Sequence, residues 1–209
     1  MGYYIFSYGI KTDQILNAFG SKDSKLQKEV EENDVFQDYS DFEVDDSKTS
    51  TNQALIDIIQ KNPFNHKSNY AYGYALIGLC DTLGKELPYG QEIKLGYETD
   101  LINKVLTEDF SIKDIEIEKY LLADNSHPFP IPKIVEWPLI GLIRQPQLQE
   151  LKTKLLSLNI TEEQIEELED DPEDREFTYA HLKGILDNIN YCLDNNLELI
   201  SFCHKEIYC

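Results

Sequence analysis

A few side chains suited to acid–base chemistry lie in the second half of the chain. His127 precedes a proline-rich stretch, Glu136 lies inside that stretch, and His181 lies in a segment with helical periodicity. If the proline-rich stretch packs across that helix, His181 and Glu136 can form an acid–base pair in a groove. A lone histidine on a helix is more often a surface or hydrogen-bonded core residue, so a structural role is the simpler interpretation.

The usual signatures of cofactor sites and hydrolases do not occur in the sequence. There is no GxGxxG, P-loop, GxSxG or HExxH motif. Cys203, His204 and Cys209 lack the paired spacing of structural zinc sites, and adjacent residues of a strand point to opposite faces. We therefore predict no cofactor and no metal, and we favour a protein without enzymatic activity.

Carboxylates are the most abundant chemical groups, and they are concentrated in two short runs. Residues 29–47 carry nine acids and no Lys or Arg, and residues 162–176 carry ten acids and one Arg. The whole chain has 39 acids and 19 bases. Without the 19 acids and one base of the two runs, 20 acids and 18 bases remain, so the rest of the chain is nearly neutral. Acidity this local is typical of a surface that binds a basic partner.

We expect each acidic run to contribute to such a surface. In the first run aromatic residues alternate with acids, so the rings would bury against a basic protein while the carboxylates meet its Lys and Arg side chains. The alternative is an exposed segment whose rings pack into the protein's own core. The candidate binding residues are Asp34, Asp38, Tyr39, Asp41, Phe42, Glu43, Asp45, Asp46, Glu166, Glu167, Glu169, Asp170 and Asp171.

The charge balance also limits the classes of partner. A sequence pI near 4.4 and only two arginines argue against direct binding of nucleic acid or of an anionic membrane face. The favoured function is a non-enzymatic acidic module that binds a basic protein. Two alternatives stay open: a small-molecule enzyme using His and Glu under the proline-rich stretch, and a nucleic-acid mimic, which requires both runs on one continuous face.

Two segments at opposite ends of the chain have the composition of β-strands. Residues 3–10 are aromatic and β-branched, and residues 197–203 repeat that character. Because an isolated strand leaves its backbone unpaired, we expect these strands to pair with each other. The segment between them has mostly helical periodicity. The predicted fold is α+β, mainly α: a helical domain with a small sheet pairing the N- and C-terminal strands.

The strongest helical prediction is for residues 68–83, where apolar and aromatic side chains occupy almost every face, as in a buried central helix. Gly73 and Gly78 each cost about 1 kcal/mol relative to Ala there, which indicates close approach of a neighbouring backbone. Residues 127–146 hold five of the eight prolines, so we expect an extended segment packed on the surface.

Shorter helices are predicted around these segments, with Thr12, Ser24 and Thr51 as N-caps, and a long helix is predicted at about residues 173–193. Without repeats or a flexible linker, the simplest organisation is a single domain over residues 1–209. Four cysteines without a CxxC pair are typical of reduced thiols, and no signal-like N-terminus or membrane-length apolar run is present. The expected location is the cytoplasm.

Several segments taken together resemble an uncharacterised bacterial family of cytoplasmic proteins of similar length. In order they are the GSKD turn (20–23), YGYALIGLC (72–80), PFPIPKIVEWPLIGLI (128–143) and LISFCH (199–204). The family is a domain of unknown function, so the resemblance implies bacterial origin and one full-length domain but no catalytic residue. Some families of this build resemble immunity partners of toxins, and by that analogy the concrete form of the binding function is an immunity-type inhibitor.

Overall fold

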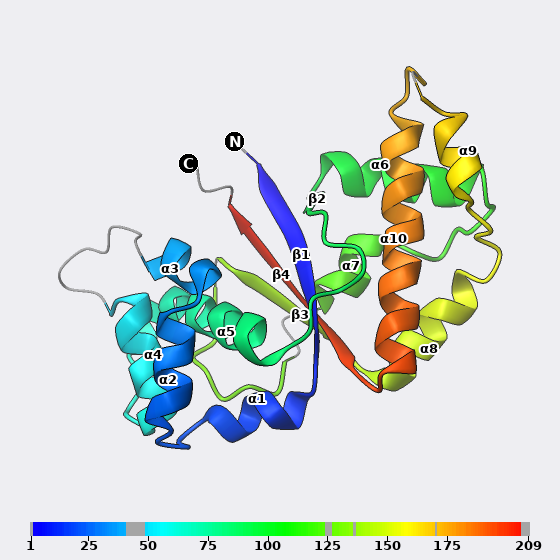
Figure 1. Cartoon of the computed structure of the whole chain (residues 1–209). Helices are drawn as coiled ribbons and strands as arrows, with labels where there is room; N and C mark the ends of the chain where they lie inside the picture. Colours follow the sequence, from blue (N-terminus) through cyan, green and yellow to red (C-terminus); the bar gives the residue numbers. More distant parts are fainter. Residues whose placement is uncertain (1, 41–48, 124–126, 136, 170, 206–209) are drawn as a thin grey trace.

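The computed structural model describes residues 2–40, 49–123, 127–135, 137–169 and 171–205 (Figure 1). Its centre is an antiparallel sheet with the strand order β2-β1-β4-β3. The strands are β1 (Tyr3–Ile10), β2 (Ile93–Lys94), β3 (Leu139–Ile143) and β4 (Glu198–Lys205). The helices are α1 (Thr12–Ala18), α2 (Ser24–Glu31), α3 (Asp34–Ser40), α4 (Thr51–Gln60), η1 (His66–Ser68), α5 (Asn69–Leu83), α6 (Tyr97–Glu108), α7 (Ile117–Leu121), α8 (Gln145–Lys154), α9 (Glu162–Glu166) and α10 (Arg175–Asp194).

The predicted pairing of the two terminal strands is confirmed. β1 and β4 pair along their whole lengths, with Tyr3 opposite Lys205 and Ile10 opposite Glu198. Both strands are rich in β-branched and aromatic residues, which suit a sheet covered on its two faces. The predicted fold class, a mainly helical α+β structure with a small sheet, is likewise confirmed.

The sheet separates two groups of helices, α1–α5 on one side and α6–α10 on the other (Figure 1). Successive side chains of a strand point to opposite faces. Phe6 and Tyr8 of β1 accordingly pack into the apolar cluster on the α5 side, whereas Ile5 joins the cluster on the α10 side. This alternation later divides the candidate site into two chemically different halves.

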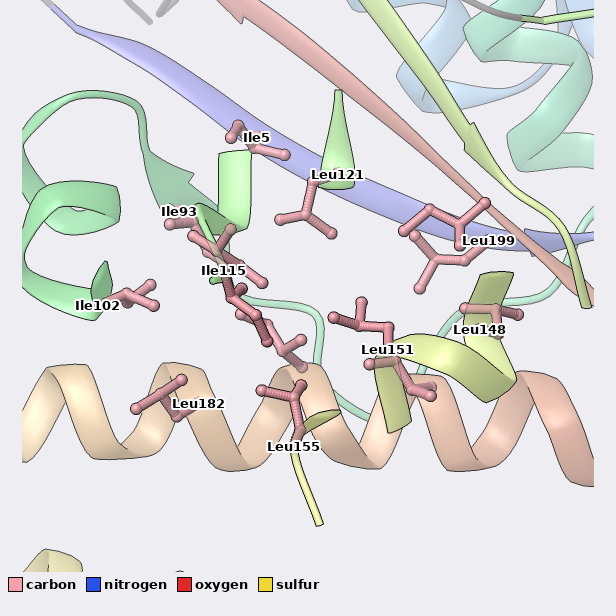
Figure 2. Packing of buried hydrophobic residues seen from close by; sticks show 14 of the residues in the cluster. Ile5, Ile93, Ile102, Ile115, Leu121, Leu148, Leu151, Leu155, Leu182 and Leu199 are labelled. Carbon is pink, nitrogen blue, oxygen red and sulfur yellow. The ribbon is translucent and has the colours of Figure 1, made fainter. Parts of the chain in front are cut away.

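The core on the α10 side fills the space between β1 and the long helix α10. Figure 2 shows Ile5 and Leu199 of the sheet above Leu182 of α10, with aliphatic side chains from the intervening helices between them. Such burial removes about 25 cal/mol of unfavourable hydration for each Å² of apolar surface, so this layer fixes α10 against the sheet.

Helix α5 is the predicted buried central helix. Every residue from Ala71 to Cys80 except Tyr74 is buried. Its two inner glycines make room for side chains rather than for a neighbouring backbone, which corrects that expectation. An added Cβ would lie 2.6 Å from Ile134 at Gly73 and 2.5 Å from Phe36 at Gly78.

The first part of the proline-rich stretch packs against α5, whereas Trp137, Leu139 and Ile143 join the α10-side cluster. Phe129 and Ile134 are buried in the α5-side cluster, and Pro138 contacts the backbone position of Gly73. The described residues of the stretch therefore do not lie across the last helix as a whole, which the expected groove required. The stretch also contains β3, an edge strand, which is the position that sheets tolerate for proline-flanked segments.

Helix starts fall close to the predicted positions, but all three predicted caps lie one residue too late. Thr12 is the first residue of α1, whose N-cap position is Lys11 and has no capping side chain. Asp23 rather than Ser24 caps α2, and Ser50 rather than Thr51 caps α4. In both cases the preceding residue is also a good N-cap type, so composition alone did not separate them. No helix in the described part of the chain is long and apolar enough to cross a membrane.

Candidate functional site

The ladder between β1 and its neighbour is interrupted, and a cavity lies at the interruption. Ile5 pairs with Ile93, and Gly9 exchanges hydrogen bonds of 3.0 and 2.8 Å with Lys85. Between these two pairs, three residues of β1 face the seven residues 86–92, which we call the bulge loop. The four extra residues carry the loop away from the strand edge.

The space between the bulge loop and β1 is a cavity of about 720 Å³, within the range of small-molecule and peptide sites. It extends around the strand edge and reaches both faces of the sheet. It is lined by Ile5, Phe6, Ser7, Tyr8, Val35, Asp38, Tyr39, Asp81, Glu86, Leu87, Tyr89, Gly90, Gln91, Glu92, Ile93, Leu121, Ile185, Asn188, Leu199 and His204.

Aromatic rings and carboxylates line the cavity on the α5 side. The Tyr8 hydroxyl is hydrogen-bonded to Asp81, and burial, with the nearby Asp81 charge, raises the Tyr8 pKa strongly. Asp81 is held in turn by Asn33, whose side-chain nitrogen donates to it at 2.6 Å. The Tyr39 pKa is also raised, first by burial and then by Glu92. Both phenols therefore stay neutral at physiological pH.

His204 closes this half of the cavity from strand β4. Its ring meets the rings of Phe6 and Tyr39 edge to face, at centroid distances of 5.2 and 5.5 Å. Its Nε2 lies 3.4 Å from Glu92 Oε1. The His204 residue is only 7% exposed. Its Nδ1 is buried and has no hydrogen-bond partner among the described residues. A buried polar atom without a partner is costly, and this one does not face the cavity, because it is inaccessible to solvent.

Apolar side chains line the cavity on the α10 side. Ile5, Leu87, Ile185 and Leu199 belong to one buried cluster and reach the cavity from four different elements of the chain. The Ser7 side chain also faces this side, where its hydroxyl lies 2.8 Å from that of Ser201 on β4. A ligand in the cavity therefore meets an acidic aromatic half and an apolar half, divided by β1.

The bulge loop is attached to α10 through Tyr89. Asn188 accepts a hydrogen bond from the Tyr89 backbone N–H and donates one to its C=O, each at 2.9 Å. The ring lies where a side chain at position 184 would be, because a Cβ added to Gly184 would come within 2.1 Å of it. These contacts fix the outer wall of the cavity.

His181 completes this attachment in a chain of hydrogen bonds. Its Nε2 lies 3.2 Å from Glu98 Oε2, and its Nδ1 lies 2.7 Å from the Tyr89 hydroxyl. Burial lowers the His181 pKa, although Glu98 opposes the effect. The neutral ring directs its one N–H to the carboxylate, so Nδ1 is an acceptor facing the Tyr89 hydroxyl. The same hydroxyl also lies 2.9 Å from Gln91 Oε1, so its single proton serves these two acceptors. Burial and Glu98 raise the Tyr89 pKa to about 12, which keeps that proton in place.

The two catalytic candidates that the structure describes, His127 and His181, do not meet. His127 stacks on Phe129 in the α5-side layer, whereas His181 lies on α10 beyond the sheet. Glu136 lies outside the described residues, and the carboxylate that faces His181 is Glu98 instead. His181 thus holds a cavity wall and does not line the cavity itself.

The first acidic run contributes two candidate binding residues to the cavity. Asp38 and Tyr39 both line it from α3, whereas Asp34 is exposed at the start of that helix. Tyr39 is 6% exposed and stacks on Tyr74, so its ring packs into the protein's own core. Asp41, Phe42, Glu43, Asp45 and Asp46 lie outside the described residues.

The second acidic run lies elsewhere. Glu166, Glu167 and Glu169 are exposed around α9, and Asp171 is half-buried. Asp170 lies outside the described residues. Figure 1 shows α3 and α9 on opposite sides of the sheet, so the described parts of the two runs do not share a face. A nucleic-acid mimic needs one continuous acidic face. The described parts of the two runs do not form such a face.

The cavity acids that sequence reasoning missed are Asp81, Glu86 and Glu92. They lie outside both acidic runs and are brought together by the ends of α5 and of the bulge loop. Among the described residues no three His, Cys, Asp or Glu side chains are grouped closely enough to hold a metal ion. Cys80, Cys192 and Cys203 are buried free thiols, as expected for residues of the core.

The fold and this site define a class: an α+β protein with an acidic, aromatic cavity at an interrupted sheet edge. The chain belongs to a family described as a domain of unknown function (DUF7691), whose model matches residues 1–204. No curated protein and no solved structure matches the chain.

Proposed function

We propose that this protein is a non-enzymatic binding module that receives a cationic group of a basic protein partner in the cavity beside the bulge loop. The group is the ammonium of a Lys or the guanidinium of an Arg. The concrete form of this function is an immunity-type inhibitor of a basic partner, by analogy with the fold of some immunity partners of toxins.

One observation carries the proposal: four carboxylates, and no Lys or Arg, occur among the described residues that line the cavity. Asp38 and Asp81 approach from the helical layer, and Glu86 and Glu92 lie at the two ends of the bulge loop. Two unit charges about 6 Å apart interact by about 0.7 kcal/mol even at the dielectric constant of water, so four acids around one cation contribute several kcal/mol at most.

The aromatic rings of the same half suit the same ligand. A cation over the face of an aromatic ring gains about 0.5–2 kcal/mol, depending on its desolvation. Phe6, Tyr8 and Tyr39 line the cavity beside these acids. The raised pKa values of both tyrosines keep their hydroxyl protons bound, so the rings add no further negative charge.

The direct test is a titration with n-butylguanidinium, followed by the backbone amide NMR signals of the cavity. The neutral, nearly isosteric probe n-butylurea is the matched control. We expect saturable shifts at Tyr8, Asp81 and Glu92 with the cation, weakening as salt is added, and no comparable shifts with the urea. Equal responses to both probes, or no response to either, would contradict the proposal.

A further inference from the structure

The interrupted ladder leaves one residue of β1 with its main chain directed at the cavity. In an antiparallel strand, residues two apart direct their N–H and C=O groups to the same edge. Gly9 pairs with Lys85 and Ile5 with Ile93 on the bulge-loop edge, so Ser7 between them directs both groups to that edge as well. Continuing the register of β2 would place Gln91 opposite Ser7, but the described ladder stops at Ile5.

The other main-chain groups of this part of β1 are already used. Phe6 and Tyr8 lie opposite Phe202 and Ile200 in the continuous ladder with β4, and their N–H and C=O groups are directed to that strand. On its β1 side, the cavity therefore offers one donor and one acceptor of the backbone, both from Ser7, at the boundary of its two halves. A peptide unit that pairs with them adds one residue to the edge of the sheet.

Such pairing determines where the neighbouring side chains of the ligand go. A ligand residue opposite Ser7 projects its side chain to the same face as Ser7, toward Leu87 and Ile185. The residue next to it in the ligand projects to the opposite face, toward Tyr8 and Asp81. The first position is therefore suited to an apolar side chain and the adjacent one to a cation.

The fixed wall gives an independent reason to expect a ligand at this edge, since Tyr89 and Asn188 hold the bulge loop away from β1 and keep the edge at Ser7 from closing on Gln91. The cavity is thus kept open at the position where a peptide unit would bind.

We propose that the partner is bound through an extended two-residue unit, one apolar residue next to one Lys or Arg, which pairs its backbone with Ser7. This inference rests on the proposed function and specifies its ligand. The apolar side chain binds against Leu87 and Ile185, and the cation binds among Asp38, Asp81 and Glu92. No covalent step is involved.

The test compares capped dipeptides with the cation alone, using the whole protein. The probes are the N-acetyl, C-methylamide forms of Leu-Arg and Arg-Leu, because the strand edge does not fix the direction of the ligand chain. We expect one order to bind about tenfold or more tightly than n-butylguanidinium. Methylating the backbone nitrogen of its Leu should lower affinity about 5- to 10-fold, since it removes the hydrogen bond to the Ser7 C=O.

A second readout uses hydrogen exchange at single amides. The N–H of Ser7 should gain protection when the dipeptide binds, whereas that of Tyr8, already in the ladder with β4, should change little. If n-butylguanidinium binds but neither dipeptide binds more tightly, or Ser7 gains no protection, the dipeptide inference is wrong and the cation site stands. If the cation and both dipeptides all fail to bind, both the dipeptide inference and the proposed function are wrong.

Discussion

Replacing Gly184 by Ala should detach the bulge loop from α10. A Cβ at this position would lie 2.1, 2.3 and 2.4 Å from three atoms of the Tyr89 ring, far inside normal contact distance. The ring must move by more than 1 Å to reach about 3.5 Å. Its hydroxyl would then lose the 2.7 Å contact with His181.

The expected cost follows from three contributions. Overpacking a filled site costs about 1–3 kcal/mol. Loss of the hydroxyl contact adds about 1 kcal/mol. Replacing Gly by Ala inside a helix returns about 1 kcal/mol. The net prediction is a loss of about 1–3 kcal/mol in the free energy of unfolding, together with weaker binding of n-butylguanidinium because the cavity wall has moved.

Urea denaturation of four proteins measures this effect: wild type, Gly184→Ala, Tyr89→Ala and the double variant. Without the Tyr89 ring the clash is gone, so Gly184→Ala should become stabilising by up to about 1 kcal/mol. Gly90→Ala, on the same loop with nothing within 4 Å of its Cβ position, is the control and should change stability little. The reasoning is refuted if Gly184→Ala has the same effect with and without the ring.

The remaining predictions concern the supports of the site. Asn188→Ala leaves the Tyr89 backbone N–H and C=O without their partner and should cost about 1–3 kcal/mol in urea denaturation; an unchanged midpoint would contradict this. Gly78→Ala forces a Cβ to within 2.5 Å of Phe36 and should lower the melting temperature, whereas a raised one would show that the ring has room to move. Burial lowers the His181 pKa below the unfolded value of about 6.5, so its contribution to stability is complete above that pH and is lost as the pH falls. His181→Gln should therefore reduce the slope of stability against pH below about 6.5, and an unchanged slope would refute this assignment.

The parts of the fold that could be predicted depend on local composition. Residues 3–10 are aromatic and β-branched, and their pairing with the last strand follows from the need to satisfy two isolated strands. Helix α5 was predictable because it has no polar face. Helix α3 was not predicted, because its acids are typical of an exposed segment while the burial of Phe36 depends on the gap at Gly78.

The candidate site was only partly predictable, because it is assembled from distant segments. Asn188 and Tyr89 are separated by 99 positions, and neither belongs to a motif. The recess at Gly184 likewise has meaning only once Tyr89 lies against it. Asp38 was identified by its acidic surroundings, whereas Asp81 carries no local signal and reaches the cavity through the geometry of α5. The local density of acids in the sequence therefore indicated the α3 side of the cavity, but not the sides formed by α5 and the bulge loop.

The most direct test of the central claim is whether the position of the carboxylates, rather than their number, controls binding. One variant neutralises three exposed cavity acids, with Asp38→Asn, Glu86→Gln and Glu92→Gln. Its control neutralises three exposed acids of the second run, with Glu163→Gln, Glu166→Gln and Glu167→Gln. Each changes the net charge from −20 to −17, the sum of −20 and three removed negative charges.

The measurement is the affinity of each variant for n-butylguanidinium, by the same NMR titration. At about 0.7 kcal/mol for each charge near 6 Å, the cavity variant should lose roughly 30-fold in affinity. The control should stay within about twofold of wild type, since its charges lie around α9 on the other side of the sheet from α3 and exposed charges are screened by salt. Equal losses in both variants would show that net charge alone attracts the cation and would contradict a site at the bulge loop.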